Sequence, residues 1–183
     1  MARDPATGLD ESLRARLARI ELVALDVDGV LTDGSIVYGD AGETQVFHVH
    51  DGAALVWLRR QGVRVAWITG RGCAATARRA DELGCRLVAG VRDKRAALAE
   101  LQEELDVGPD TTLAMGDDLP DLGLAERAGV FCSPADGRPE VRERAALVTE
   151  ARGGRGAVRE VVELLLAARG AREAGDGARD GTG

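Results

Sequence analysis

The chain has 183 residues, a formal net charge of −7 at pH 7 and 45% hydrophobic residues. This length fits one domain, and the apolar content is sufficient for a core, which excludes a globally disordered chain. The negative charge argues against nucleic acid, whose binding calls for a basic patch. It is also unfavourable for an anionic substrate, unless a bound cation reverses the local field.

Both ends of the chain lack apolar periodicity. Residues 1–9 and 170–183 are rich in Gly, Ala, Arg and Asp. We expect both ends to be flexible and a single domain to span 10–169. The first residues carry no apolar signal-peptide core, and no segment approaches the ~20 apolar residues of a membrane span. The three cysteines form no CxxC pattern, which is typical of a reducing compartment. We therefore predict a cytoplasmic protein that binds neither nucleic acid nor membrane.

Short apolar runs alternate with amphipathic stretches along the chain. The apolar runs predict buried strands at 22–25, 63–68, 86–88, 112–115 and 129–131. The amphipathic stretches predict helices at 53–60, 74–83, 94–105 and 157–168. This alternation predicts an α/β fold, a three-layer Rossmann-like parallel sheet with helices on both faces. Such sheets bind ligands at the carboxyl ends of their strands.

One stretch interrupts the alternation. Residues 35–38 and 45–49 have strand patterns and flank a turn-rich connector. They predict a β-hairpin over 34–50 that projects from the sheet. On its second strand His48 and His50 would share one face, as partly exposed side chains, or with His50 contacting an anion, rather than as metal ligands. No insertion is long enough to form a separate cap domain over the strand ends.

Two acidic clusters follow two of the predicted strands. Asp26 and Asp28 come directly after the first strand. Asp117, Asp118 and Asp121 follow the fourth. Carboxylates gathered at one edge of a parallel sheet would repel one another unless a cation lay between them. Oxygen ligands without nearby His or Cys favour Mg²⁺ over zinc.

Two possible phosphate donors lie between these clusters in the sequence. Thr69 follows a predicted strand, and Lys94 opens a predicted helix. A hydroxyl and an ammonium group are donors that a transferring phosphoryl group needs. Taken alone, Thr69 could be an ordinary strand-end hydroxyl and Lys94 a solvated helix start. Asp118 could equally be a helix N-cap.

The order of these residues resembles the four motifs of the haloacid-dehalogenase superfamily. More narrowly, the chain is similar to the capless 3-deoxy-D-manno-octulosonate 8-phosphate (Kdo 8-phosphate) phosphatases in DVDGVLTDG, ITGR, the DK before a helix, GDDLPDL and GGRGAVRE. The resemblance covers roughly residues 20–168, and five motifs in order are far more specific than one. It implies a phosphatase of lipopolysaccharide biosynthesis that hydrolyses Kdo 8-phosphate through an aspartyl-phosphate intermediate.

The resemblance also implies a role for each matching residue. Asp26 would be the nucleophile, and Asp28 the general acid and then the general base. Thr69 and Lys94 would hold phosphoryl oxygens. Mg²⁺ would be bound by the carboxylates of Asp26 and Asp117 and by the backbone carbonyl of Asp28.

Other positions have less specific implications. Of Asp118 and Asp121, one would orient Lys94 or the metal's ligands and the other would cap the following helix. Substrate contacts would come from Gly29, Thr32, Gly70, Arg71, Asp51 and Arg155. Arg71 would pair with the sugar-acid carboxylate, and an Arg here goes with the eight-carbon substrate, whereas Glu goes with nine-carbon acids. A surface salt bridge is the alternative for Arg71.

The family's members are tetramers whose hairpins associate, so the resemblance implies a homotetramer. The segment 153–156 would be a mobile tail, with Arg155 reaching an active site of its own or of a neighbouring subunit. An ordinary loop before a helix is the competing interpretation of this segment.

Four positions depart from the family pattern: Gln45, His50, Ala54 and Cys73. Gln45 and His50 stand where basic residues are usual, Ala54 where Gly is usual, and Cys73 where a hydroxyl residue is common. They put the substrate in question more than the chemistry. The alternatives are a phosphatase for a nine-carbon, sialic-acid-type phosphate, a broader sugar phosphatase, or a catalytically idle relative that serves in assembly.

Overall fold

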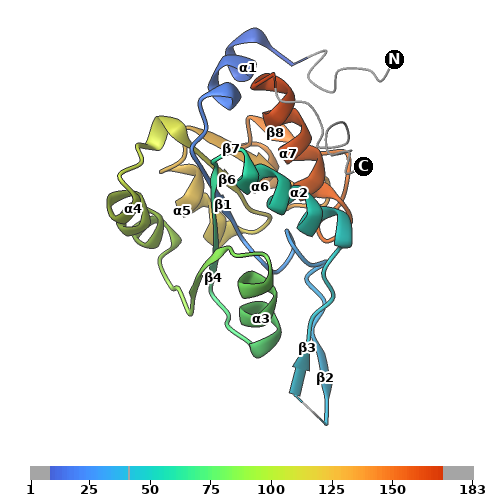
Figure 1. Cartoon of the computed structure of the whole chain (residues 1–183). Coiled ribbons are helices and arrows are strands. Elements are labelled where there is room, and N and C mark those ends of the chain that lie inside the picture. The colour runs from blue at the N-terminus through green and yellow to red at the C-terminus, as the bar shows by residue number, and fades with distance from the viewer. Residues whose placement is uncertain (1–8, 41, 171–183) are drawn as a thin grey trace, which may run out of the picture.

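In the computed structural model, which describes residues 9–40 and 42–170, one parallel sheet lies between two layers of helices (Figure 1). The strands of this sheet are β1 (Leu22–Leu25), β4 (Arg64–Thr69), β5 (Arg86–Ala89), β6 (Thr112–Met115), β7 (Val130–Ser133) and β8 (Leu147–Val148). The helices are α1 (Glu11–Ala18), α2 (Val49–Arg60), α3 (Ala74–Glu82), α4 (Lys94–Leu105), α5 (Leu122–Ala125), α6 (Pro139–Arg142) and α7 (Ala157–Ala168). The predicted α/β fold is confirmed.

The strand order is β5-β4-β1-β6-β7-β8, with every neighbouring pair parallel. The chain first builds outward from β1 through β4 to β5, and then returns to the other side of β1 with β6. The order therefore reverses between β1 and β6, which is where an open sheet of this kind forms a crevice beyond its strand ends. Leu25 is level with Met115 in this pair, so the residues that follow both strands enter that crevice side by side.

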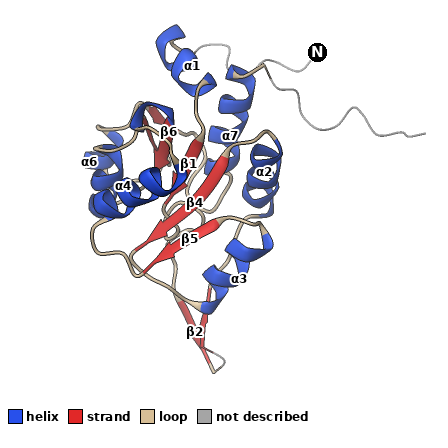
Figure 2. Ribbon diagram, turned by 60° about the vertical axis from the view of Figure 1, so that its left-hand side comes forward, coloured by secondary structure: helices blue, strands red, loops and turns tan. Residues whose placement is uncertain are grey.

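Helices cover both faces of the sheet (Figure 2). Alternate residues of a strand point to opposite faces. Val23 and Leu25 accordingly lie in the core cluster beneath α1, α2 and α7. Leu22 and Ala24 lie in the other cluster, beneath α4 and α5. Burial on both faces explains why β1 is a continuous apolar run.

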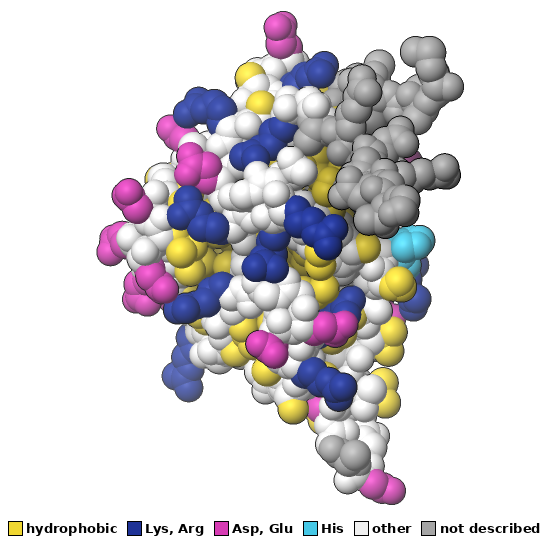
Figure 3. Space-filling model, viewed as in Figure 1, with side chains coloured by type: hydrophobic (Ala, Val, Ile, Leu, Met, Phe, Trp, Pro, Cys, Tyr) yellow, Lys and Arg dark blue, Asp and Glu magenta, His cyan; other side chains and the backbone are white. Residues whose placement is uncertain are grey.

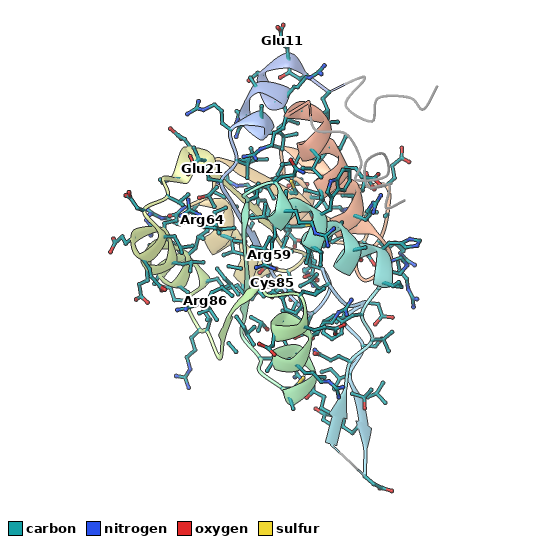
Figure 4. All side chains as sticks on the ribbon, viewed as in Figure 1. Glu11, Glu21, Arg59, Arg64, Cys85 and Arg86 are labelled. Carbon is teal, nitrogen blue, oxygen red and sulfur yellow. The ribbon has the colours of Figure 1, made fainter. Side chains whose placement is uncertain are left out.

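The amino ends of the strands are fixed by side-chain contacts away from the crevice. Arg64, at the start of β4, lies 3.2 Å from the carboxylate of Glu21 and donates to the carbonyl of Leu105 at 2.5 Å (Figure 4).

Among the described residues, no helix is long and apolar enough to cross a membrane.

A small hairpin, β2 (Val37–Gly39) and β3 (Gly42–Thr44), forms a separate antiparallel pair that projects from the body of the molecule (Figure 1). The predicted second strand at 45–49 is wrong. Residues 45–48 form neither strand nor helix, and α2 already begins at Val49. The apolar pattern of this segment reflects packing on the core instead, because the ring of Phe47 stacks on that of Trp67, with 5.9 Å between the ring centroids.

The two histidines are therefore not on one strand face. His48 is the N-cap of α2, and His50 lies in its first turn, with the two rings edge to face at 5.0 Å. Most of the predicted flexible ends, 1–8 and 171–183, lie outside the described residues. Within the described part of the chain, no further domain covers the strand ends.

Candidate active site

Three segments of the chain meet at the switch point between β1 and β6. Asp26 follows β1, Lys94 is the first residue of α4, and Asp121 follows β6. The Lys94 Nζ donates to Asp26 Oδ1 at 2.6 Å and to Asp121 Oδ1 at 2.5 Å. All three side chains are buried. One ammonium group thus joins carboxylates from two neighbouring strand ends.

Asp117 brings a further carboxylate to this cluster. Oxygens of Asp26, Asp117 and Asp121 lie within 4.8 Å of one another. The Oδ1 of Asp117 is buried and has no hydrogen-bond partner among the described residues. Gly29 makes this approach possible, since a Cβ at that position would lie 2.1 Å from Asp117 Oδ2 and its φ of +92° disfavours other residues.

The electrostatics of the cluster call for a cation. Burial, aided by the charge of Asp121, raises the pKa of Asp26 to about 7, although Lys94 acts in the opposite direction. Burial and the charges of Asp26, Asp121 and Asp118 raise the pKa of Asp117 to about 8. The neighbouring carboxylates raise the pKa of Lys94 against the effect of its burial. One ammonium is insufficient for this much buried negative charge.

The donor set fits a magnesium ion. The ligands are carboxylate oxygens, with no His or Cys among the residues that gather there, and oxygen-only sets suit hard cations such as Mg²⁺. Asp26 and Asp117 are the better candidates, because Asp117 has an unpartnered buried oxygen. Both oxygens of Asp121 are already engaged, one by Lys94 and the other by the backbone N–H groups of Asp117 and Asp118.

The structure separates the roles of Asp118 and Asp121. Asp121 is 1% exposed and positions Lys94. Asp118 is exposed and caps the short 3₁₀ helix η2 (Leu119–Asp121), accepting from the N–H of Leu119 at 2.8 Å. The predicted division of labour therefore assigns orientation to Asp121 and capping to Asp118.

Asp28 lies in a second polar group, beside the first. Its Oδ1 accepts from Gln45 Nε2 at 2.9 Å, and its Oδ2 lies 3.5 Å from Arg71 Nε. Arg71 also pairs with Glu43 of β3 at 2.8 Å. The hairpin therefore contributes two side chains, Glu43 and Gln45, to the surroundings of Asp28 and Arg71.

The remaining residues at the strand ends shape the backbone. Thr69 ends β4, is 2% exposed, and its hydroxyl accepts from the N–H of Arg71 at 3.1 Å, which fixes the turn through Gly70. The hydroxyl of Thr32 is buried and accepts from the N–H of Gly34 at 3.2 Å. This contact supports the loop after β1 and leaves Thr32 little freedom to contact a substrate.

Asp51 lies apart from the cluster. Its oxygens accept from the N–H groups of Gly156 at 3.2 Å and Arg159 at 2.8 Å, at the start of α7. Burial raises its pKa, while these two N–H groups lower it. A side chain that is 1% exposed and doubly engaged positions α7, so the structure gives no support to a substrate contact by Asp51.

The GGRG segment packs on the loop that follows β1. The N–H of Gly154 donates to the carbonyl of Val30 at 2.9 Å. Arg155 is exposed and pairs with Asp33 at 3.1 Å. The segment is a loop before α7, and Arg155 lies beside the loop after β1 of its own chain.

Sequence reasoning identified the buried cluster but missed the contacts of the hairpin. Gln45 was recognised only as a departure from a family pattern. Its bonds to Asp28, Cys73 and Thr76 connect segments distant in sequence, which no local pattern reveals. The only signal was that Gln45 and Cys73 both depart from the family pattern.

Comparisons with known proteins agree with this geometry. Residues 85–161 match the model of the haloacid dehalogenase-like hydrolases. The chain is 40% identical over 127 residues to the 3-deoxy-D-manno-octulosonate 8-phosphate phosphatase KdsC of Escherichia coli K12, covering 68% of each chain. The chain belongs to the Kdo 8-phosphate phosphatase family.

Solved structures place the chain in the same family. The Kdo 8-phosphate phosphatase of Moraxella catarrhalis, solved with magnesium, phosphate and KDO, is 40% identical, with a TM-score of 0.85 over 88% of this chain and 94% of that one. A hypothetical protein from Xanthomonas campestris is 42% identical, with a TM-score of 0.90 over 93% and 94% of the two chains. The haloacid dehalogenase-like fold without a cap domain is therefore shared along nearly the whole chain.

Proposed function

We propose that this member of the Kdo 8-phosphate phosphatase family is a magnesium-dependent phosphatase that hydrolyses Kdo 8-phosphate to Kdo and phosphate. The observation that carries the proposal is the buried cluster of Asp26, Lys94, Asp117 and Asp121 at the switch point. The Moraxella relative, solved with magnesium, phosphate and KDO, supports the same reaction here.

The carboxylates of Asp26 and Asp117, with the backbone carbonyl of Asp28, would hold the metal. When bound, Mg²⁺ supplies positive charge that stabilises the phosphoryl oxygens and offsets the buried carboxylates. Lys94 keeps Asp26 oriented and supplies a second positive charge to the same oxygens. Thr69 and the turn through Gly70 close the other side of the phosphate site.

The proposed reaction has two steps. A carboxylate oxygen of Asp26 attacks phosphorus, and the bond to the sugar oxygen breaks while Asp28 gives that oxygen a proton. Asp28, now a carboxylate, takes a proton from water as the water oxygen attacks phosphorus. The bond between Asp26 and phosphorus then breaks, which releases phosphate and restores both side chains.

Arg71 is the proposed partner of the sugar-acid carboxylate. It lies 3.5 Å from Asp28, so an anionic group bound to its guanidinium would lie beside the proposed acid. Its present partner, Glu43 of the hairpin, occupies the guanidinium as a substrate carboxylate would.

We also propose that four copies associate through their hairpins. Side chains of the hairpin region expose apolar surface, with Tyr38 75%, Val46 64% and Val37 52% exposed. A cluster of exposed apolar side chains on a projecting element is typical of an interaction surface. By contrast, basic and acidic side chains are interspersed over the face shown in Figure 3, which does not favour a nucleic-acid partner. Three unpaired cysteines support a cytoplasmic location.

The test is phosphate release from Kdo 8-phosphate, with and without Mg²⁺, by the wild type and by Asp26→Asn. We expect turnover that requires Mg²⁺ and disappears in the variant, because the amide cannot form the phosphoenzyme. Release from another sugar phosphate alone would overturn the substrate assignment. No phosphate release from any member of a panel of sugar phosphates would overturn the enzymatic function.

A further inference from the structure

Gln45 contacts the side chain of the proposed acid and base directly. It follows β3, and its Nε2 donates to Asp28 Oδ1 at 2.9 Å. Asp28 is partly exposed, with 21% of its side chain accessible. A partly solvated carboxylate needs contacts to hold it in one orientation. Gln45 supplies one on Oδ1, while Arg71 lies near Oδ2 at 3.5 Å.

The amide of Gln45 is itself held in one orientation. Its Oε1 accepts from the hydroxyl of Thr76 and from the thiol of Cys73 at 3.2 Å. Thr76 is 2% exposed, in the first turn of α3. An ionised carboxylate can only accept, so the NH₂ group faces Asp28, and the hydroxyl and the thiol are placed to donate to Oε1. The start of α3 thus fixes which end of the amide meets the carboxylate.

We infer that Gln45 is a positioning residue for Asp28, held by Thr76 and Cys73, and that it favours protonation of the departing sugar oxygen. This inference rests on the proposed function and names the residue that serves its acid and base. Gln45 need not touch the substrate. Its effect is to keep the Asp28 carboxyl where it delivers a proton to the leaving group and later receives one from water.

A dependence on the leaving group distinguishes this role from a structural one. Kdo 8-phosphate loses an alkoxide, which needs a proton as it departs, whereas p-nitrophenyl phosphate loses a stable phenolate that does not. For Gln45→Leu we expect kcat/KM for Kdo 8-phosphate to fall about 10- to 100-fold, since hydrogen bonds to charged groups have effects of that order. For p-nitrophenyl phosphate we expect a fall of less than about threefold.

Two further variants define the mechanism. Gln45→Lys keeps an N–H donor toward Asp28, so it should recover most of the turnover number lost in Gln45→Leu. Thr76→Val keeps the shape of the side chain but removes the donor that fixes the amide, so it should show the same substrate dependence with a smaller loss. Thr76→Val also provides the test if Gln45→Leu does not fold.

The control is Gln61→Leu, the same substitution at an exposed position that caps the carboxyl end of α2, where we expect no change with either substrate. Equal losses of kcat/KM for the two substrates in Gln45→Leu would overturn the inference. A loss of kcat/KM for Kdo 8-phosphate that lies entirely in KM would also overturn it. Wild-type turnover of Kdo 8-phosphate tests the proposed function separately, so failure of one is distinguishable from failure of the other.

Discussion

At the scale of single residues, Lys94 is the point on which the buried charges depend. Its ammonium group lies 2.6 Å from Asp26 and 2.5 Å from Asp121, with only 7% of the side chain exposed. Lys94→Met keeps the length of the side chain but leaves these carboxylates without their cation. We expect the free energy of unfolding to fall by about 3–5 kcal/mol without Mg²⁺, as for other broken buried pairs, and turnover to be lost.

The matched control is the neighbouring residue. Arg95 also pairs with an acid, Glu126 at 3.3 Å, but more than half of each side chain is exposed. Exposed pairs contribute at most about 1 kcal/mol, so Arg95→Met should change little. Urea unfolding of both variants in EDTA makes the comparison, and equal losses would contradict the role given to Lys94.

Asp117, unlike Lys94, should destabilise the fold when no metal is bound. Its pKa is raised from 3.8 to about 8, so the fold favours its protonated form. The stability that this preference contributes is fully present below about pH 3.8 and is lost as the pH rises toward 8. Asp117→Asn is neutral throughout, so without metal at pH 8 it should be more stable than the wild type by on the order of 1–3 kcal/mol.

Mg²⁺ should reverse this ranking. An ion that binds only the folded state raises the melting temperature, and the wild type has the carboxylate that the variant lacks. Thermal unfolding with EDTA and with Mg²⁺ measures both effects. A variant stabilised by Mg²⁺ as strongly as the wild type would show that Asp117 does not hold the metal.

Sequence alone was sufficient for the residues of the buried cluster, because Asp26 and Asp117 follow strands whose ends a parallel sheet brings together and Lys94 opens a helix at the same edge. It did not determine which of Asp118 and Asp121 orients Lys94, since both follow the same strand and only the turn geometry decides. For Asp51, the sequence likewise did not reveal which groups its side chain contacts. A carboxylate near a site in the sequence can be turned to a helix terminus, as the N–H groups of α7 turn this one.

At the scale of elements, two loops that carry the site depend on close packing. A Cβ on Gly153 would lie 1.8 Å from the carbonyl oxygen of Gly29, in the loop after β1. Gly153→Ala should therefore displace that loop, lower the free energy of unfolding by about 1–3 kcal/mol, and reduce kcat/KM about tenfold or more. Chemical unfolding and steady-state kinetics measure the two effects.

Gly108 provides the control for this substitution. It has an ordinary φ of −80°, and a Cβ there would meet nothing within 4 Å. Gly108→Ala should leave activity unchanged and keep or slightly raise stability, by up to about 1 kcal/mol. Unchanged activity and stability in Gly153→Ala would show that the loops around Gly29 and Gly153 can move apart to accept a Cβ, which would contradict this prediction.

The helices and strands with the strongest local sequence patterns were predicted most accurately. The expected β1, β6, α4 and α7 match the structure residue for residue, because each is a long amphipathic stretch or a continuous apolar run. β8, of two residues, is too short to leave a pattern. The strand expected over 45–49 failed because an apolar ring packed on the core and a paired strand have the same alternation.

At the scale of the whole molecule, the exposed apolar side chains of the hairpin region are where we propose that copies of the chain associate. If four copies meet there, Val37→Lys should introduce a charge into the contact, yield monomers, and lower activity where a neighbour helps to close the site. Val148→Lys is the control, since Val148 is 40% exposed on the edge strand β8. Size-exclusion chromatography with light scattering gives the result, and a wild-type monomer with full activity would contradict the tetramer.

The position of β1 at the centre of the sheet has a consequence for synthesis of the chain. β1 is made early, but one of its two neighbours, β6, ends only at Met115. While the ribosome makes the intervening residues, the apolar β1 has an open edge, which is a hazard for aggregation. Asp26 likewise leaves the ribosome long before Asp117, so no early fragment can bring the proposed metal ligands together. The site can therefore assemble only after β6 has been made and has paired with β1.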